Sequence, residues 1–302
     1  MKFVTVFNKK FLGQGALLCR SLLITQVSSS ITVFTDDLDL EPTLLGFFEY
    51  ESRKKIKVQL LKEIETGDLL EAKATRSPRE YYWTLASTIL SQELEKSDCP
   101  VAYVDADTFY FRDIATSFEH FFGDNNKHVL ITPHFYDHHS DYSWKFGIYC
   151  VQLVIGKPQG RDIIRNWAQE CLEWCYDRIE GEKYGDQKYL DYWPIKYGPR
   201  VYVASKEHPI LGPWNQRSIY DVEPLGIHFQ GLRVSKSGYI DLGHDLITHP
   251  RFERYYLPYI ESLRSILGLR KKSPLVTCYC LVKYMLMRFH RDIKRLWSHL
   301  SV

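Results

Sequence analysis

The stretch Val101-Ala-Tyr-Val-Asp105-Ala-Asp107 joins a short apolar segment to two carboxylates that a single residue separates. The four apolar residues at its start predict an interior strand. Ligands of open α/β sheets bind at the carboxyl ends of the strands, where both aspartates would lie. Their like charges repel unless a cation lies between them, and Mg²⁺ or Mn²⁺ bridging to substrate phosphates is the usual solution. The motif therefore predicts a metal site, and a turn that uses Asp for its backbone preference is the alternative.

Strands and helices alternate on both sides of this stretch. A helix is predicted just before it, with Ser77 as N-cap, Pro78 at the first helical position and Glu80 three residues after the cap. Further strands are expected at 3–7, 31–34, 56–60, 129–132 and 147–155, and further helices at 17–23 and 163–175. This alternation predicts an α/β fold with a doubly wound, mostly parallel sheet.

The composition is that of an ordinary globular protein. Of the 302 residues, 45% are hydrophobic and 25% are charged, which is enough for one large domain. Seven cysteines occur without a C-x-x-C pair, so we interpret them as reduced thiols. The apolar run at the amino terminus is too short for a signal peptide, and no run reaches the roughly 18–20 apolar residues of a membrane span. We therefore expect a protein on the cytoplasmic side of the membrane.

Four further motifs follow one another along the chain. They are Arg76-Ser-Pro-Arg-Glu-Tyr-Tyr-Trp-Thr84, Tyr184-Gly-Asp186-Gln187, Gly212-Pro-Trp214-Asn215 and His228-Phe-Gln-Gly231. In this order, with the Asp-x-Asp, they resemble the nucleotide-sugar glycosyltransferases of the GT-A fold. The chain looks most like the bacterial family 8 retaining galactosyl- and glucosyltransferases that build lipopolysaccharide and related glycans. The resemblance implies a GT-A-like domain over residues 1–260, followed by a tail over 261–302.

The resemblance also implies how the donor is held. Asp105 and Asp107 would bind a divalent cation against the donor diphosphate, and His228 matches a third ligand whose imidazole favours Mn²⁺ over Mg²⁺. Arg76 looks like the basic residue that contacts the donor diphosphate or sugar. Arg233, or Lys236 beside it, would supply a second phosphate contact, although the Lys-Pro-Trp usual near there is absent.

Asp186 and Gln187 match the pair that lies beside the anomeric carbon of the donor in such retaining enzymes. Asp186 would bind sugar hydroxyls, and the Gln187 amide oxygen would stabilise an oxocarbenium-like state during front-face transfer. The start of a surface helix is the alternative for this pair. Cys150 stands where related sequences tend to carry Asn, so a hydrogen bond to the donor sugar is expected to be missing.

The remaining candidates lie at strand ends and in loops. Asn8, and Asp36 with its neighbour Asp37, follow the first two predicted strands and are candidates for base or ribose contacts, with an ordinary strand-to-loop acid as the alternative. Trp214 and Asn215 would line the acceptor side, and a turn after Gly212-Pro213 is equally compatible with them. Residues 133–144 contain three histidines, but we interpret this segment as a solvated loop because no metal-ligand spacing is met.

The last 33 residues form a basic, amphipathic segment. Apolar residues recur at helical spacing between Leu275 and Leu300, and residues 270–302 carry eight Lys or Arg against one Asp. A peripheral anchor on anionic lipid at the inner face of the cell membrane would fit a lipid-linked acceptor. A coiled-coil homodimer and a helix docked on the body are the alternatives. Binding of nucleic acid is not expected, because no nucleic-acid motif accompanies the charge.

The sequence therefore predicts a metal-dependent glycosyltransferase. It would move a hexose or N-acetylhexosamine from a nucleotide sugar, most simply a UDP-sugar, to a glycan or lipid-linked acceptor with retention. A sugar nucleotidyltransferase would need a glycine-rich, basic loop after the first strand, and Gly13-Gln-Gly15 matches such a loop only in part. An inverting transferase would need a carboxylate base, with Asp191 or Asp137 as candidates. A sugar-binding protein without catalysis would not need the metal ligands.

Overall fold

The computed structural model describes residues 1–302 except 139–140, 216–218, 220, 235–239, 243–251 and 270–302. Its centre is a seven-stranded sheet of order β3-β2-β1-β4-β7-β6-β8. The strands are β1 (Lys2–Val6), β2 (Ser30–Thr35), β3 (Ile56–Leu60), β4 (Val101–Val104), β6 (Val129–Pro133), β7 (Tyr149–Gly156) and β8 (Val201–Val203). All neighbouring pairs in it are parallel except those made by β7, which runs antiparallel to β4 and β6. The prediction of a mostly parallel α/β sheet is confirmed.

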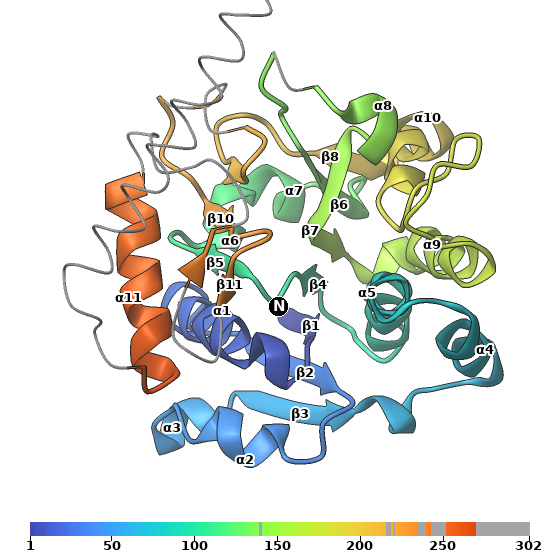
Figure 1. The fold of residues 1–302 in the computed structure, drawn as a ribbon. Coiled ribbons are helices and arrows are strands. Elements are labelled where there is room, and N and C mark those ends of the chain that lie inside the picture. Colours follow the sequence, from blue (N-terminus) through green and yellow to red (C-terminus); the bar gives the residue numbers. More distant parts are fainter. Residues whose placement is uncertain (139–140, 216–218, 220, 235–239, 243–251, 270–302) are drawn as a thin grey trace, which may run out of the picture.

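Helices cover both faces of this sheet (Figure 1). On one face α4 (Gly67–Thr75), α5 (Pro78–Glu95) and α9 (Arg161–Glu173) pack on Val101 and Tyr103 of β4. On the other face α1 (Leu12–Thr25), α2 (Leu40–Leu45), α6 (Ile114–Ser117) and α7 (Glu119–Gly123) pack on Ala102 and Val104. Successive side chains of a strand point to opposite faces, so β4 is apolar throughout because both of its faces are buried.

The start of α5 forms as the sequence predicts. The Ser77 hydroxyl accepts from the main-chain N–H of Glu80, and the Glu80 carboxylate accepts from the N–H of Ser77. This capping box satisfies two N–H groups that the first turn leaves unpaired. It fixes where the longest helix of the described residues begins, and that helix packs along α9.

Smaller elements complete the fold. β5 (Thr108–Tyr110), β10 (Gly226–His228) and β9 (Ile210–Leu211) form a second sheet, and β11 (Arg233–Val234) pairs with β12 (Ile240–Asp241). The short helices are α3 (Tyr50–Arg53), α8 (Ser143–Phe146) and α10 (Trp193–Tyr197).

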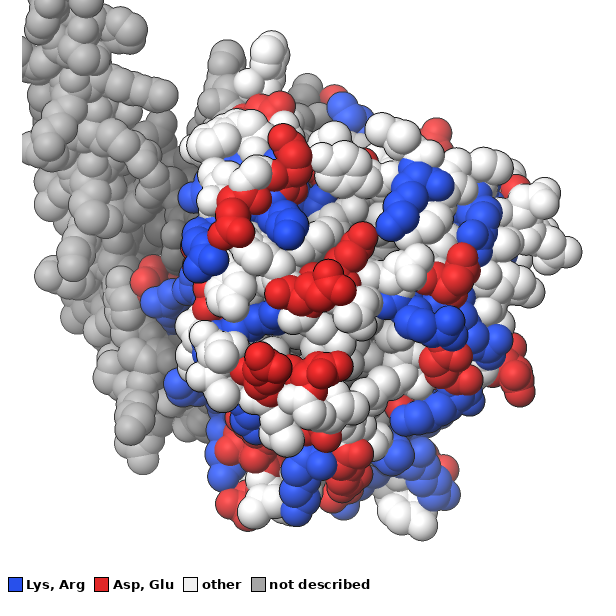
Figure 2. Space-filling view, turned by 90° about the vertical axis from the view of Figure 1, so that its right-hand side faces the viewer, with Lys and Arg blue, Asp and Glu red and all other residues white. Residues whose placement is uncertain are grey.

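Figure 2 faces the side of the molecule where α4, α9 and α10 lie, and there acidic and basic side chains are interspersed. This face offers no broad area of one charge.

The last described helix belongs to the body of the protein. α11 (Leu257–Ile266) packs against α1, and a Cβ on Gly13 would lie 2.6 Å from the side chain of Leu263. Leu263 is fully buried, so the domain boundary predicted after residue 260 falls inside a helix that the core holds. The predicted tail helix lies in 270–302, outside the described residues. Among the described helices, none combines the length and apolar character needed to cross a bilayer.

Candidate functional site

Two strands bring the Asp-x-Asp motif and His228 together. Asp105 follows β4 at the carboxyl edge of the main sheet, and Asp107 directly precedes β5. β5 pairs antiparallel with β10 in a register that sets His228 opposite Thr108, and Phe229 N donates to the Asp107 carbonyl at 2.8 Å. The pairing therefore places a histidine 121 positions later in the chain beside both carboxylates.

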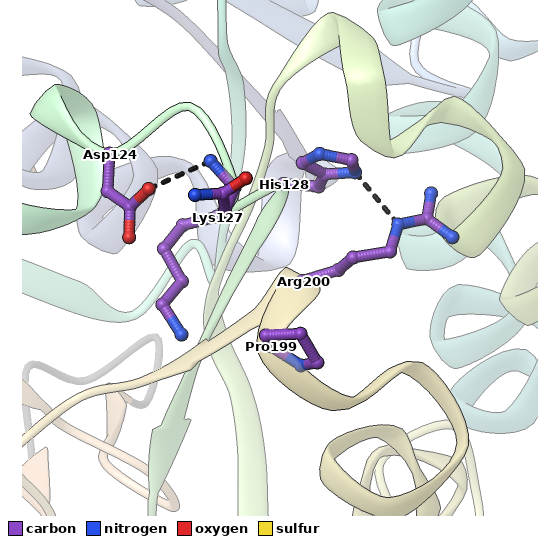
Figure 3. Close-up of a pocket in the computed structure, with 6 residues that line it drawn as sticks. Asp124, Lys127, His128, Pro199 and Arg200 are labelled. Atoms are coloured by element: carbon purple, nitrogen blue, oxygen red, sulfur yellow. Dashed lines mark hydrogen bonds between the residues drawn. The ribbon is translucent and has the colours of Figure 1, made fainter.

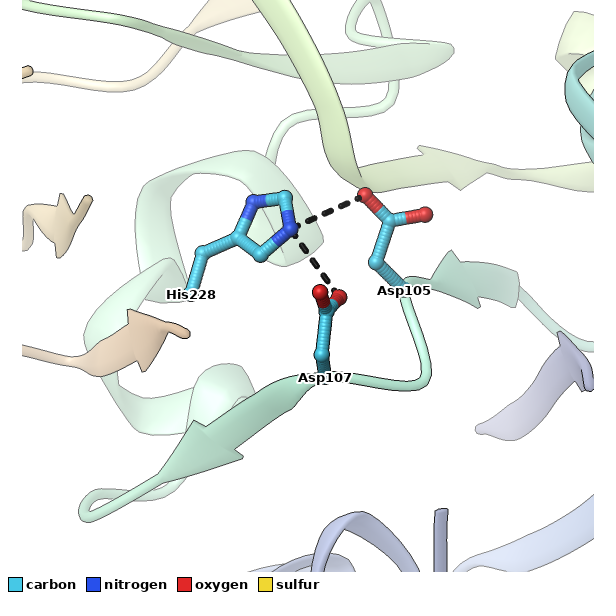
Figure 4. A group of neighbouring side chains, drawn as sticks. All are labelled: Asp105, Asp107 and His228. Atoms are coloured by element: carbon cyan, nitrogen blue, oxygen red, sulfur yellow. Dashed lines mark ion pairs between the residues drawn. The ribbon is translucent and has the colours of Figure 1, made fainter. Parts of the chain in front are cut away.

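The three side chains converge on one point (Figure 4). His228 Nε2 lies 3.0 Å from Asp107 Oδ1 and 3.8 Å from Asp105 Oδ2. One potential ligand atom from each residue lies within 4.8 Å of the others. Within the described part of the chain, no other group of three or more His, Cys, Asp or Glu side chains comes this close together. Two carboxylates and an imidazole are a donor set that suits Mn²⁺, and the nitrogen makes it less suited to Mg²⁺. The residues thus fit a divalent cation.

The side chains of this cluster shift one another's pKa values. Burial raises the pKa of Asp105 to about 6, with His228 opposing and the like charge of Asp107 adding to the rise. Burial by itself would lower the pKa of His228, but the carboxylates of Asp107 and Asp105 hold it well above its ordinary value. A site that perturbs ionisation in this way, at the edge of a sheet, has the electrostatics of a functional site.

Two buried side chains that the sequence did not single out hold this cluster. The Tyr103 hydroxyl donates to Asp105 Oδ1 at 3.2 Å. Gln152, fully buried on β7, places its Oε1 3.2 Å from His228 Nδ1. The run of apolar residues around Gln152 offered one signal, because a lone amide inside a buried strand has to find a hydrogen-bonding partner.

In the pair Asp186-Gln187, at the same edge, Asp186 is buried and Gln187 is half-buried. Gly185 before it adopts φ +53°, a left-handed conformation that turns the chain inward. Asp186 is 5% exposed, and its carbonyl accepts from Trp167 Nε1 at 2.8 Å. Burial, with the charge of nearby Asp105, raises the pKa of the Asp186 carboxyl well above its usual range. The alternative of an exposed helix start does not hold for Asp186.

The amide of Gln187 has a fixed orientation. Its Nε2 donates to the carbonyl of Phe146, at the end of α8, at 2.6 Å. Because the amide nitrogen is engaged there, the oxygen is directed away from Phe146 and keeps its lone pairs for another group. α8 thus positions the residue that the sequence predicts to be catalytic.

Asn8 and Asp36 meet through a tyrosine. Asn8 Nδ2 donates to the Tyr82 hydroxyl at 3.0 Å, and that hydroxyl donates to Asp36 Oδ1 at 3.0 Å. Asn8 and Asp36 follow β1 and β2, neighbouring parallel strands, and Tyr82 comes from α5. Tyr82 lies within the motif that starts at Arg76, and the structure adds it to this polar group.

Arg76 takes a different place from the one predicted. It is 8% exposed, and its guanidinium donates to the Thr84 hydroxyl and to the carbonyls of Cys171 and Leu172, in the last turn of α9. A guanidinium that caps helix carbonyls is held by the scaffold. The structure therefore gives Arg76 a packing role, in place of the contact with the donor.

The acceptor candidates Trp214 and Asn215 separate into two roles. Asn215 is fully buried, and its side-chain amide bonds the main chain of His134, Ile210 and Gly212, so it holds a loop instead of facing an acceptor. Trp214 is half-buried, and its ring meets the His228 ring edge to face at 5.6 Å between centroids. His134 is buried too, which corrects the expectation of a solvated loop at that position.

The second phosphate contact stays a prediction. Arg233 opens β11 and is exposed, five positions after the metal-ligand candidate His228. Lys236 lies outside the described residues.

A separate hollow of about 490 Å³ lies at the other edge of the sheet (Figure 3). It is formed by the segments that lead into β6 and β8, so it borders the amino ends of these parallel strands. There Arg200 Nε donates to His128 Nδ1 at 2.9 Å. The metal-ligand candidates stand at the opposite, carboxyl edge, where ligands of such sheets bind. This hollow is therefore separate from the candidate site.

Comparisons with known proteins agree with this architecture. No family model matches the chain. The uncharacterized protein YfnD of Bacillus subtilis (strain 168) is 27% identical over 226 residues, which are 68% of this chain and 71% of YfnD. The uncharacterized protein YfnF of the same strain is 26% identical over 285 residues, 86% of this chain and 89% of YfnF.

Among solved structures, the galactosyltransferase LgtC in complex with donor and acceptor sugar analogs superposes with a TM-score of 0.53. The two are 14% identical, and the match covers 90% of this chain and 98% of LgtC. A second LgtC structure, an active-site mutant in which glutamate replaces a glutamine, gives a TM-score of 0.56 at 13% identity, covering 91% of this chain and 98% of that one. The protein therefore has the GT-A fold of nucleotide-sugar glycosyltransferases, as the sequence resemblance predicts.

Proposed function

We propose that the protein is a metal-dependent glycosyltransferase that moves a hexose or N-acetylhexosamine from a UDP-sugar to a glycan acceptor with retention. The observation that carries this proposal is the meeting of Asp105, Asp107 and His228 at the carboxyl edge of a GT-A sheet. The buried carboxyl of Asp186 lies near enough to Asp105 for their charges to interact. A metal site next to a second buried acid provides both a phosphate clamp and a sugar contact.

The roles of the side chains follow from their geometry. Asp105, Asp107 and His228 would hold the cation, which when bound neutralises the charge of the leaving nucleoside diphosphate as a Lewis acid. The buried Asp186 carboxyl would accept hydroxyl groups of the donor sugar. The Gln187 oxygen, oriented by the bond of its Nε2 to Phe146, would stabilise developing positive charge at the anomeric carbon. A side-chain amide is a poor nucleophile, which favours front-face transfer.

The nucleoside would bind where β1 and β2 end. Asn8, Tyr82 and Asp36 form a connected polar group there, on the two strands beside β4. Base and ribose edges carry donors and acceptors that such a group can match, and strand ends are the usual location for nucleotides in these sheets.

An aromatic wall supports a sugar as the acceptor. Ring contacts run without a break from the metal ligand His228 to Tyr184, with centroids 4.6 to 6.4 Å apart: His228, Trp214, His134, Tyr136, Tyr142, Phe146 and Tyr184. Burial lowers the pKa of His134 to about 3, so this ring is neutral at physiological pH. Tyr142 is 48% exposed and its neighbour Trp144 is 66% exposed. Exposed aromatic faces beside a catalytic site suit the apolar face of a pyranose ring.

The same structure argues against a sugar nucleotidyltransferase and against an inverting transferase that uses Asp191. Gly13 and Gly15 lie inside α1, where added Cβ atoms would meet Leu263 and Phe7, so they serve packing and do not form the phosphate loop of a nucleotidyltransferase. Asp191 accepts from the N–H of Ile148 at 2.7 Å and so holds the segment after α8. That bond argues against Asp191 as the free base of an inverting enzyme.

A screen of nucleotide sugars tests this function. We expect slow, Mn²⁺-dependent hydrolysis of one or more UDP-sugars, and added saccharides should divert the donor from hydrolysis to transfer. Proton NMR should show that the product keeps the α-configuration of the donor. A β-linked product would mean inversion, and a complete absence of hydrolysis and transfer with every nucleotide sugar would refute the proposed reaction.

We also propose that residues 270–302 anchor the protein on the inner face of the cell membrane, near a lipid-linked acceptor. The proposal rests on the apolar spacing and basic charge of the sequence. Ending the chain after residue 269 should abolish binding to anionic vesicles, whereas activity on a soluble saccharide should persist because the candidate site lies before residue 240. Vesicle binding that the truncation leaves unchanged would refute the anchor, and a dimer that dissociates instead would identify a coiled coil.

A further inference from the structure

Gln152 is a buried amide that touches two parts of the metal site. It lies on β7, the antiparallel strand between β4 and β6, and is fully buried. Its Oε1 is 3.2 Å from His228 Nδ1, and its main-chain carbonyl accepts from the N–H of Asp105 at 3.4 Å. Burial of an amide in an apolar strand costs free energy unless the amide is hydrogen-bonded. Its Oε1 finds this partner in His228, whereas its buried Nε2 has no hydrogen-bond partner among the described residues.

The bond decides which nitrogen of His228 can bind a cation. A neutral imidazole carries one N–H and one lone pair, on different nitrogens. With Nδ1–H donating to the Gln152 oxygen, the lone pair remains on Nε2, which faces Asp107 and Asp105 at 3.0 and 3.8 Å. In the other tautomer Nε2 would carry the hydrogen and could not ligate. Partners of this kind orient metal-binding histidines in other proteins.

The side chain of Gln152 carries no charge, which affects the net charge of the metal site. Two carboxylates and a divalent cation give a metal site without net charge, which can accept an anionic diphosphate. A carboxylate at position 152 would orient His228 equally well, but it would add a buried negative charge beside the phosphates. Gln152 orients the histidine without this charge.

We propose that Gln152 is a positioning residue that holds His228 in the tautomer that binds the cation, and so sets the affinity of the site for Mn²⁺. This inference rests on the metal site of the proposed function but not on the sugar transferred. It is tested by binding of Mn²⁺ alone, measured by the EPR signal of the free ion, so no donor or acceptor has to be known.

Gln152→Met keeps the length of the side chain and removes the acceptor oxygen. We expect it to weaken Mn²⁺ binding by about 10- to 100-fold. Gln152→Glu restores an acceptor at the same position and should recover affinity to within a few fold of the wild type. The control Thr132→Val removes a buried hydroxyl of neighbouring β6 that bonds the carbonyls of Cys150 and Leu153. It should lower the melting temperature but leave Mn²⁺ affinity unchanged.

A double-mutant cycle separates positioning from general damage. In a His228→Ala background, where Asp105 and Asp107 remain as ligands, Gln152→Met should have no further effect on Mn²⁺ affinity. Wild-type affinity in Gln152→Met, or effects of the two changes that add, would overturn the proposal. Should Gln152→Met not fold, Gln152→Asn, whose shorter side chain cannot reach Nδ1, gives the same reading. A wild-type protein that binds no Mn²⁺ would refute the metal site itself.

Discussion

Asp107→Asn should lower kcat/KM by about a thousandfold and abolish tight Mn²⁺ binding. The carboxylate lies 3.0 Å from His228 Nε2 and is one of three groups that would hold the cation. Loss of a Lewis acid removes several kcal/mol of transition-state stabilisation, and about 4 kcal/mol corresponds to this factor. Coupled assays of UDP release and EPR titration with Mn²⁺ measure both effects.

The fold should survive this change, because Asn fills the same volume. A matched control is Asp124→Asn, which alters an aspartate in the hollow at the opposite edge of the sheet (Figure 3) and should keep full activity. In the wild type, EDTA should remove activity and Mn²⁺ should restore it. Undiminished turnover in EDTA would show that Asp105, Asp107 and His228 are not a catalytic metal site.

Asp186→Asn should lose activity yet gain stability at neutral pH. We expect kcat to fall by about 10²- to 10³-fold, the usual cost of removing one group that acts on the transition state. The carboxyl is 5% exposed, and burial with the charge of Asp105 raises its pKa well above the ordinary value. Folding therefore favours its protonated form, and wild-type stability falls as pH rises from the pKa of the unfolded chain through that of the folded chain. Asn, which cannot ionise, avoids this loss.

Urea unfolding of the metal-free protein across pH measures the effect. The stability advantage of Asp186→Asn should vanish below about pH 4, where the carboxyl is protonated in both states, and should grow toward neutral pH. Asp162 is a control for which the opposite change in stability is expected. Burial acts to raise its pKa, but the hydrogen bond and charge of Arg200 lower the pKa overall. Asp162→Asn should therefore be slightly destabilised at neutral pH. An Asp186→Asn protein that is less stable than the wild type at every pH would refute the prediction that the buried Asp186 carboxyl lowers stability at neutral pH.

The sequence predicted features that depend on neighbouring residues. The capping box at Ser77 forms because its partners stand three residues apart in one helical turn. β3 begins and ends where its alternating pattern predicts, and the Asp-x-Asp follows β4 because a buried strand has to end before charged residues. These are local relations, and the chain alone contains them.

Other side chains have partners that the sequence does not indicate. Arg76 stands next to a motif helix, but the carboxyl end of α9, almost a hundred positions later, takes its guanidinium. Asn215 follows a turn, as the sequence indicates, and the surrounding main chain engages its amide. A sequence shows that a polar group needs partners, but it does not show which of them packing will bring within reach.

The sequence by itself determined the strand that carries Asp105 and Asp107, the α/β alternation and the identity of the metal-ligand candidates. Only the tertiary structure decided that these groups meet, because the register of β5 with β10 sets His228 beside Asp107. The tertiary structure also decided the role of Gln152. Both faces of β7 are buried, so the lone amide in its apolar pattern shows that Gln152 needs a partner but not that this partner is His228. That choice depends on which strands pair with β7, and pairing is a property of the folded chain.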